Sequence, residues 1–431
     1  MRTVAFGSGA RSRMIRALVI TALLLSGGTA AVPAAAHAEP PPLPSDDPFY
    51  TYDQPLTTTD PGTVLRSRPA PFAFPNLSTP ITSTQVLYRT TTQQNTPTAA
   101  VTTVLRPLVP GPTRLLSYHM AYDALGSQCN PSYTLTGRTD SPGAVMEQAV
   151  IAGYLTAGYT VVVPDYEGLH LEWTVGRQSG YATLDGIRAA EQILGLPAST
   201  PIAMSGYSGG SVATEWAAEI APHYAPELTL VGAAAGGLPV HLAHNLPYVS
   251  GSADWAGVIP AMVVAFRRAY NLDTAAFLSE RGAQLTDAVE TMCLGQFAKR
   301  YPGLTDAEMV RAPYHSLLDV PAAAAAVNDN IMGTAGTPAV PLLLAVGQSD
   351  PIGDSVMVAR DIEALAHRYC GSGVPVTYAR YQHHDHIAAF ARFQAEAAQF
   401  LTDRFAGTPP TTNCASVGPG NSLAPVPIPA G

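Results

Sequence analysis

Gly206-Tyr207-Ser208-Gly209-Gly210 is the stretch of sequence that decides the fold of this chain. A short apolar run, Pro201-Ile202-Ala203-Met204, precedes it and predicts a buried strand. The residues that follow, 211–220, have the pattern of a helix. A Gly-x-Ser-x-Gly sequence between a strand and a helix is typical of a nucleophile elbow, a sharp turn that exposes the serine and leaves room only for small residues beside it. Ser208 is therefore our candidate nucleophile.

Short apolar runs alternate with helical segments on both sides of this turn. The alternating pattern of 85–90 and 99–105 predicts an early antiparallel pair of strands. Further strands are expected at 114–119, 159–165, 228–232, 340–346 and 374–378, and helices at 147–157, 183–194, 354–369 and 387–405. Such alternation favours a mostly parallel sheet that is covered by helices on both faces. The predicted fold class is α/β.

The alternation is interrupted once, which divides the expected core into two parts. Residues 84–236 form the first part and residues 338–406 the second. Between them, residues 237–337 carry helical patterns (253–270, 272–281, 285–297 and 306–310) and no convincing strand. We interpret this insertion as a helical cap or lid over the serine, and the alternative is a helical subdomain without a gating role.

The two ends of the chain have different compositions from the core. Four arginines precede the apolar run 17–25, and Ala36-His37-Ala38 offers a cleavage site, so residues 1–38 are predicted to be a signal peptide. Residues 39–83 are expected to form an extended lead-in over the surface, and residues 407–431 a Pro-rich tail. We therefore expect an extracellular protein, either free or associated with the cell wall.

Composition excludes two classes of function. Charged residues make up 13% of the chain and the net charge is −9, whereas nucleic-acid binding would call for a basic surface. The leader's apolar run is too short to span a bilayer, and no later segment reaches that length, so we expect no stable membrane insertion.

Four cysteines, Cys129, Cys293, Cys370 and Cys414, fit an oxidising compartment. They lack Cys-x-x-Cys spacing, which argues against a zinc site. Four cysteines allow three pairings, and the sequence alone does not choose among them. Their positions along the chain favour Cys370–Cys414, which leaves Cys129–Cys293.

A serine hydroxyl is a poor nucleophile at neutral pH, so it needs a base that takes its proton and a carboxylate that orients this base. In the chain order serine, acid, histidine, the acid follows a later strand. Asp350 comes shortly after the apolar run 340–346 and is our predicted acid. Asp354 is the alternative, but we interpret it as the residue that opens the next helix, since Asp is favoured at helix N-termini.

The candidate base lies in a cluster of histidines just before the last expected helix. His386 immediately precedes that helix and is our predicted base, whereas His383 and His384 are interpreted as neighbouring loop residues. Histidines beside an aspartate can also indicate a metal site. Adjacent side chains rarely converge on one ion and no other ligands are evident, so we predict no metal.

Acyl transfer also needs hydrogen-bond donors for the oxyanion that forms at the attacked carbonyl. One donor should be the main-chain N–H of Gly209, directly after the nucleophile. The second should come from the loop after 114–119, where Asp123 is our candidate; the alternative is that Asp123 only caps a turn. Asp165 and Glu167, at the end of another strand, are interpreted as hydrogen-bonding residues that hold their loop.

Five stretches together resemble the secretory lipase family, an α/β-hydrolase group related to fungal lipase A. They are Ser117-Tyr118-His119-Met120-Ala121-Tyr122-Asp123, Cys129-Asn130-Pro131-Ser132-Tyr133, Val163-Pro164-Asp165-Tyr166-Glu167-Gly168, Leu184-Asp185-Gly186-Ile187-Arg188-Ala189-Ala190 and Gly206-Tyr207-Ser208-Gly209-Gly210. The resemblance spans roughly residues 60–405. The chain departs from the family where His-His-Asp-His, at 383–386, replaces a plain Gly-x-His.

The resemblance implies an α/β-hydrolase fold, a helical cap and a triad of Ser208, Asp350 and His386. It also implies an oxyanion hole from Asp123 and Gly209, and it supports the cysteine pairs Cys129–Cys293 and Cys370–Cys414. Its members are secreted esterases and lipases.

We therefore expect a secreted, monomeric triacylglycerol lipase or carboxylesterase that acts on lipid esters, with a lipid–water interface as one place of encounter, and that needs no cofactor. Apolar residues of the insertion are candidates for an acyl pocket or for the insertion's own core: Trp255, Ile259, Pro260, Met262, Val263, Val264 and Phe266. Two alternatives remain open at this point, a secreted acyltransferase with the same triad and a non-catalytic binding protein on a hydrolase scaffold.

Overall fold

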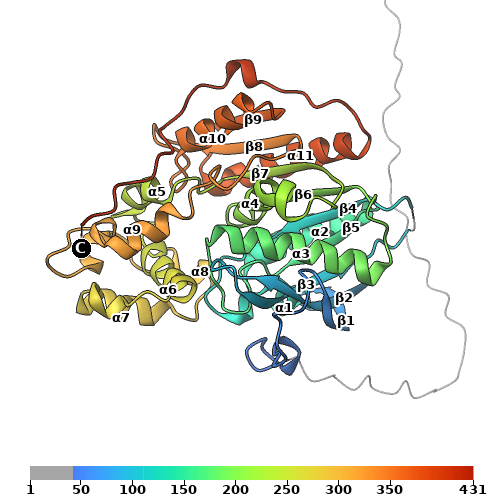
Figure 1. Ribbon diagram of the computed structural model, residues 1–431, viewed down its shortest axis with the longest axis horizontal. Coiled ribbons are helices and arrows are strands. Elements are labelled where there is room, and N and C mark those ends of the chain that lie inside the picture. The colour runs from blue at the N-terminus through green and yellow to red at the C-terminus, as the bar shows by residue number, and fades with distance from the viewer. Residues whose placement is uncertain (1–41, 110, 431) are drawn as a thin grey trace, which may run out of the picture. The chain divides into compact units, whose positions relative to one another are not determined.

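The structure is a computed structural model that describes residues 42–109 and 111–430. The predicted signal peptide, 1–38, lies outside the described residues. Within them, nine strands form one sheet in the order β1-β2-β3-β5-β4-β6-β7-β8-β9 (Figure 1). The strands are β1 (Val64–Phe74), β2 (Leu77–Thr91), β3 (Pro97–Leu105), β4 (Leu115–His119), β5 (Thr160–Pro164), β6 (Ile202–Tyr207), β7 (Leu230–Gly236), β8 (Leu342–Gln348) and β9 (Val376–Gln382).

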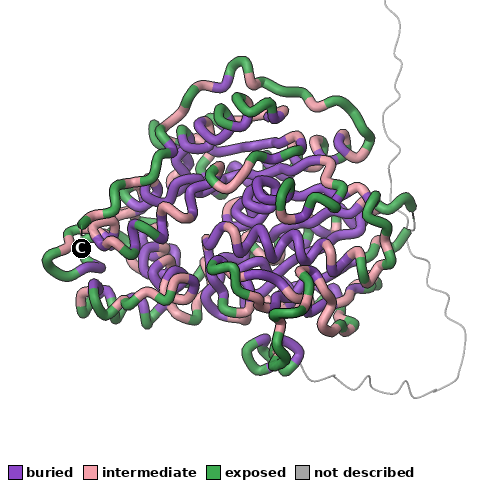
Figure 2. The backbone as a smooth tube through the Cα atoms, in the orientation of Figure 1, coloured by how far each residue is buried: buried purple, intermediate pink, exposed green. Residues whose placement is uncertain are grey.

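The sheet is antiparallel at one edge and parallel elsewhere. β1, β2, β3 and β5 pair antiparallel in that order, and every pair from β5 through β4 to β9 is parallel. β4, β5 and β6 are buried along their whole length, as Figure 2 shows for the centre of the sheet. Strands that are buried on both faces read as continuous apolar runs, which is why these three strands could be recognised in the sequence.

Helices cover both faces of the sheet. The helices are α1 (Pro131–Thr134), α2 (Pro142–Thr156), α3 (Gly176–Leu194), α4 (Gly209–Tyr224), α5 (Leu242–Val249), α6 (Val258–Tyr270), α7 (Glu280–Val289), α8 (Leu294–Phe297), α9 (Pro321–Asn328), α10 (Ala359–Gly371) and α11 (His386–Phe405). α3, α4 and α10 pack against one face, in a core that includes Ile202 and Met204 of β6. α2 and α11 pack against the other face, in a core that includes Ala203. The predicted α/β-hydrolase architecture is confirmed.

The segment that we expected to be an extended lead-in, 39–83, is largely a hairpin. β1 pairs along its length with residues 77–88 of β2, and the turn between them places Asn76 at a φ of 60°. Much of β1 is half-buried or exposed, and it carries two prolines at the edge of the sheet, where no neighbouring strand needs their missing N–H. This polar, proline-containing pattern hides a strand from sequence analysis, so the prediction is wrong for 64–83.

The insertion between β7 and β8 contains helices and, in its described residues, nothing more strand-like than isolated bridges. α6 and α7 lie within or near expected helices, but the prediction of a helix at 272–281 is wrong. That segment holds a short 3-10 turn, Thr274–Ala276, and a bridge between Leu278 and Val310. α5 and α9 have no counterpart among the expected helices.

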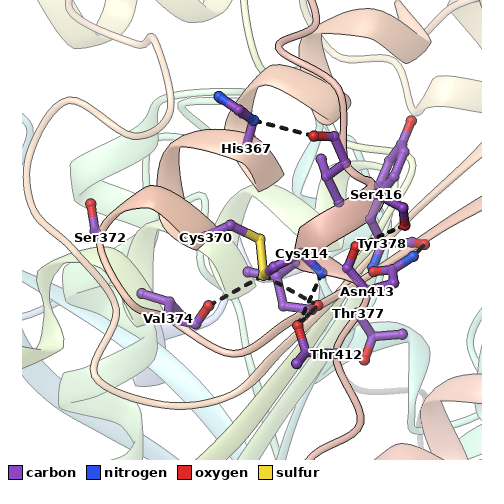
Figure 3. Close-up of a disulfide and its surroundings, with 12 residues drawn as sticks. His367, Cys370, Ser372, Val374, Thr377, Tyr378, Thr412, Asn413, Cys414 and Ser416 are labelled. Atoms are coloured by element: carbon purple, nitrogen blue, oxygen red, sulfur yellow. Dashed lines mark hydrogen bonds between the residues drawn. A yellow bond between two sulfur atoms is a disulfide. The ribbon is translucent and has the colours of Figure 1, made fainter.

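Both expected disulfides are present. Cys129–Cys293 joins the loop after β4 to the insertion, across 164 residues of sequence. Cys370–Cys414 joins the end of α10 to the C-terminal tail, and Figure 3 shows the tail lying beside β9 at this point. There the main-chain N–H of Asn413 donates to the carbonyl of Val376. The disulfide thus fixes the tail to the second part of the core.

The Pro-rich tail continues beyond the disulfide onto the insertion. The carbonyl of Ala424 is hydrogen-bonded to His241 Nε2, just before α5. Further along, the N–H of Val426 donates to Asn328 at the end of α9, and the Asn328 amide donates back to Val426. Outside the turn Cys414–Ser416, the described residues of the tail form no helix or strand. The tail therefore connects the second part of the core with two helices of the insertion.

Removing the tail disulfide should loosen this connection. The bond closes a loop with a sequence separation of 44 residues. Loop-closure entropy then gives an expected loss of about 2–4 kcal/mol in the free energy of unfolding when both Cys370 and Cys414 are replaced by serine. Urea unfolding measures this loss, and limited proteolysis should cut the variant after residue 405 first.

A matched control is Ser416→Ala, at the same exposed turn, which should change the free energy of unfolding by less than about 0.5 kcal/mol. Equal stability and equal protease resistance of the double-serine variant and the wild type would show that the disulfide does not hold the tail.

Candidate active site

Ser208 lies at the turn between β6 and α4, in the strained conformation expected of a nucleophile elbow. Its φ is 54°, in the left-handed region that non-glycine residues rarely adopt. A Cβ at Gly206 would collide with the carbonyl of Gly210, and a Cβ at Gly210 would collide with the carbonyl of His119 on β4. The turn therefore requires glycine at both flanking positions, which is the physical basis of the sequence motif.

His386 links Ser208 to a buried carboxylate. Its Nε2 lies 2.7 Å from Ser208 Oγ, and its Nδ1 lies 2.8 Å from Asp354 Oδ2. The carboxylate accepts the Nδ1 proton, so the hydrogen-bond pattern leaves Nε2 free to accept the serine proton. Asp354 is fully buried and His386 is 2% exposed. The arrangement has the geometry of a Ser-His-Asp triad.

The backbone around His386 holds the imidazole in place. The N–H of His386 donates to the carbonyl of Asp354 over 2.8 Å, and the Tyr207 hydroxyl donates to the carbonyl of His386 over 2.7 Å. Asp385, at the N-cap of α11, accepts a hydrogen bond from Ala388. His386 is thus the first residue of a capped helix, and these bonds fix its main chain, while the bond from Nδ1 to Asp354 orients its ring.

The prediction of Asp350 as the acid is wrong, because its carboxylate faces its own turn. Asp350 Oδ1 accepts from the N–H groups of Ile352 and Gly353, and Oδ2 accepts from the Tyr248 hydroxyl over 2.6 Å. Partial burial alone would raise the pKa of this carboxyl, but the hydrogen bonds from Tyr248 and the two N–H groups outweigh it and lower the pKa.

Asp354 takes the place beside the histidine because the helix that follows begins later than the sequence suggested. We expected that helix to start at 354, but α10 starts at Ala359. Asp354 is therefore a loop residue, and its Oδ1 accepts from the N–H groups of Val356 and Met357. The feature of the sequence that could have indicated a loop at Asp354 is the apolar run just after it, which buries the loop against the core.

Of the three clustered histidines, only His386 contacts the serine. The N–H of His383 donates to the carbonyl of Gln348, and His384 Nδ1 is hydrogen-bonded to the carbonyl of Gln382. His383 is exposed, and His384 is half-buried with its ring beside that of Tyr381. Within the described chain, no group of three or more His, Cys, Asp or Glu side chains is arranged to hold a metal ion.

Asp123 and Gly209 meet next to Ser208. A Cβ at Gly209 would collide with the Asp123 carboxyl group, so the two residues are in contact. Gly209 is the first residue of α4, where a main-chain N–H has no partner inside the helix. Asp123 has a φ of 41°, and Trp173 Nε1 donates to its Oδ1 over 2.5 Å. Both residues are placed so that their main-chain N–H groups suit the role of hydrogen-bond donors to an oxyanion at Ser208.

The Asp123 carboxyl group is buried, and its pKa is higher than the ordinary value. Burial raises its pKa to about 6, against the opposing effects of the Trp173 hydrogen bond and of a charge on His386. Trp173 was not singled out in the sequence, and nothing in its local pattern distinguishes it from an ordinary core aromatic. Its role as the partner of Asp123 became visible only in the fold.

The site opens into an apolar cavity of about 640 Å³, its open mouth included. Ser208, Gly209 and Asp123 lie in its wall, and most of the remaining wall comes from the insertion. The insertion's main apolar contributions are Leu242, Leu246, Val249, Trp255, Ile259 and Met262. The Trp255 ring also packs edge-on against the His386 imidazole, with 5.6 Å between ring centroids. Of the seven candidate acyl-pocket residues, Trp255, Ile259 and Met262 line the cavity, and Pro260, Val263, Val264 and Phe266 are buried outside its lining.

Several known proteins are similar to this chain in sequence and in fold. Residues 140–413 match the secretory lipase family. The chain is 39% identical over 383 residues to a Mycobacterium tuberculosis protein named "probable inactive lipase", with 86% of this chain and 84% of that protein covered. It is 32% identical over 413 residues to lipase A of Moesziomyces aphidis, with 91% and 88% covered. The crystal structure of Candida antarctica lipase A in its closed state superimposes with a TM-score of 0.80 at 31% identity, over 90% of this chain and 92% of that one.

Replacing each of the two candidate acids by asparagine should separate them. Asp354→Asn removes the carboxylate that orients His386 and stabilises its charged form, so we expect Ser208 to react with an organophosphonate about a thousandfold more slowly. Asp350→Asn, the matched control in the same loop, should slow the reaction less than about tenfold. Phosphonylation rates at pH 7.5 measure both effects, and the opposite ranking would restore Asp350 as the acid.

Proposed function

Because the chain belongs to the secretory lipase family, we propose that it is a secreted serine hydrolase that cleaves carboxylic esters of lipids through an acyl-enzyme. The observation that carries this proposal is the His386 imidazole placed between Asp354 and Ser208, at the wall of an apolar cavity. Acylglycerols are the substrate class with the required chemistry, an ester carbonyl attached to an apolar chain.

In the proposed reaction, Ser208 Oγ attacks the ester carbonyl while its proton passes to His386 Nε2. The carbonyl oxygen becomes negatively charged and accepts hydrogen bonds from the main-chain N–H groups of Gly209 and Asp123. The intermediate then collapses, and the leaving alcohol takes the proton from Nε2. Water repeats the sequence on the acyl-enzyme and releases the fatty acid. Asp354 stabilises the imidazolium in both halves.

The cavity gives the acyl chain an apolar environment. Leu242, Leu246 and Val249 come from one helix of the insertion, α5, and Ile259 and Met262 come from the next, α6. Burying one methylene of a substrate against such a wall contributes about 0.8 kcal/mol. This favours esters with a hydrocarbon chain over short, polar esters.

Export fits the covalent structure. Two disulfides persist in an oxidising compartment, and they join segments that are distant in sequence. In the described part of the chain, no helix is long and apolar enough to cross a membrane. We propose that the leader at 1–38 directs the protein out of the cell.

One relative's name raises the alternative of a non-catalytic protein. In this chain, the hydrogen bonds from serine to histidine and from histidine to aspartate are both formed, at 2.7 Å and 2.8 Å. A protein that had lost catalysis would have no need to keep this pair of bonds beside a strained serine. We therefore favour an active enzyme.

Ser208→Ala tests the proposal. The variant lacks the nucleophile, so we expect turnover of p-nitrophenyl esters to fall by at least about a thousandfold, while the melting temperature stays close to that of the wild type. His386→Ala should be comparably damaging. His384→Ala, the matched control, should keep activity within about twofold, because the His384 side chain lies against Gln382 and Tyr381 and has no hydrogen bond to Ser208.

Product analysis in the presence of an added alcohol separates hydrolysis from acyl transfer, since fatty acid indicates the first and a new ester the second. A wild-type protein that neither cleaves esters nor reacts with an organophosphonate would refute the enzymatic proposal.

A further inference from the structure

Two buried carboxyl groups hold the loop that carries Asp123, and the proposed chemistry does not yet use them. The N–H of Ala121 donates to both oxygens of Glu147, on α2, at 3.2 and 3.1 Å. The N–H of Ala124 donates to both oxygens of Glu167, which follows β5, at 3.4 and 3.1 Å. The two glutamates thus bind main-chain groups on either side of Asp123. Glu147 is 5% exposed and Glu167 is fully buried.

The insertion holds the same loop from the other side. The N–H of Leu294 donates to the carbonyl of Asp123 over 3.0 Å, and the N–H of Leu125 donates to the carbonyl of Met292 over 2.9 Å. The disulfide at Cys293 lies between these two bonds. The N–H of Asp123 donates to no residue in the described chain. The loop is therefore fixed on both sides of Asp123, and the N–H of Asp123 is left free beside Ser208.

The carboxyl groups around this loop lack counter-ions. In the part of the chain that the structure describes, Glu147, Glu167 and Asp123 form no ion pair with Lys or Arg. Arg268 is the nearby cation, but its guanidinium donates to main-chain carbonyls, among them that of Leu125. Burying several unpaired carboxylates together would be very costly, so neutral carboxylic acids are the favoured form at Glu147 and Glu167.

We propose that Glu147 and Glu167 are positioning residues of the oxyanion hole, which hold the loop of Asp123 beside Ser208 as uncharged carboxylic acids. This inference rests on the proposed function, since an oxyanion forms only if Ser208 attacks a carbonyl. The uncharged form matters because a carboxylate at either position would repel the negative charge of the intermediate. The same side chains therefore hold the loop without slowing catalysis only while they keep their protons.

The surroundings of the two groups agree with this protonation state. Burial raises the pKa of Glu147 to about 8, the hydrogen bond from Ala121 opposes this rise, and Asp123 adds to it. Burial also raises the pKa of Glu167 well above its ordinary value, with further contributions from Asp123 and Asp165 and an opposing one from Arg268.

Among the other titratable groups that face them, Asp123 and Asp165 have pKa values of about 6 and 7 and so lose their protons below pH 8, and the rest are tyrosines. Glu147 faces Tyr118 of β4 and Tyr166 after β5, and Glu167 faces Tyr122 of the loop itself and Tyr166. Burial raises the pKa of all three hydroxyls well above the ordinary value. They stay neutral in the pH range of interest, so Glu147 is the group whose charge changes near pH 8.

The proposal predicts that kcat falls as the pH rises. Between about pH 6 and 8 the Asp123 carboxyl is ionised and Glu147 is neutral, so Glu147 adds no negative charge near the oxyanion. As pH rises through about 8, Glu147 loses its proton. A unit charge about 10 Å from the oxyanion, at an effective dielectric constant of about 20, lowers the rate roughly tenfold. We expect kcat to fall above pH 8 to a lower plateau.

Glu147→Gln and Glu147→Ala separate charge from position. The glutamine keeps a carbonyl that can accept from Ala121 but cannot ionise, so the ratio of kcat at pH 9.5 to kcat at pH 7 should rise about tenfold over that of the wild type. The alanine removes the hydrogen bond, so kcat should fall at least tenfold at pH 7 with KM changed less than threefold. Kinetics with a soluble p-nitrophenyl ester measure both, and circular dichroism at each pH checks that the protein stays folded.

Glu215→Gln is the matched control. Glu215 is also buried with a raised pKa, but its hydrogen bond comes from Tyr369, and it has no contact with the loop of Asp123. This variant should keep the wild-type ratio of kcat at the two pH values.

A wild-type kcat that stays flat between pH 7 and 9.5 would overturn the inference even if no variant folds. A glutamine variant with the wild-type decline, or an alanine variant with kcat within twofold of the wild type, would do the same. In all three results Ser208 still turns over ester, so the proposed function stands. A wild-type protein without turnover and without phosphonylation would instead remove the proposed function, and the inference with it.

Discussion

The strained backbone of Ser208 is the constraint on which the rest of the site depends. A φ of 54° at a serine persists only where the surrounding structure fixes it, and here β6, α4 and the close contact with β4 do so. The same turn places Oγ and the first N–H of α4 side by side. Nucleophile and oxyanion donor are therefore positioned by one turn, and the other catalytic groups must come to this point.

The remaining groups reach the serine from the ends of later strands and from the insertion. Asp354 follows β8 and His386 follows β9, two strands that pair in parallel beside β7, so their carboxyl ends lie at the same edge of the sheet. The insertion adds the cavity wall and, through Leu294, a hydrogen bond to Asp123. In this arrangement the insertion does more than line the cavity, because it also fixes the loop that we propose to stabilise the oxyanion.

The sequence predicted those parts of the fold and site that local physics determines. Ser208 and the buried strands were visible because a glycine-flanked turn and continuous apolar runs have few alternative structures. Asp354 was missed because the start of α10 depends on how its loop packs, and β1 was missed because an edge strand has a polar, proline-containing pattern. The positions of Glu147 and Trp173 beside Asp123 depend on tertiary contacts between distant segments, to which no local pattern points.

The central claim is that Ser208 carries the acyl group during turnover. Acid quenching of the enzyme while it hydrolyses a long-chain p-nitrophenyl ester, followed by mass spectrometry of the peptides, tests this most directly. The account predicts the mass of one acyl group on the peptide that contains Ser208, and none on the same peptide of the Ser208→Ala variant. Steady turnover with the acyl group on another residue would contradict it.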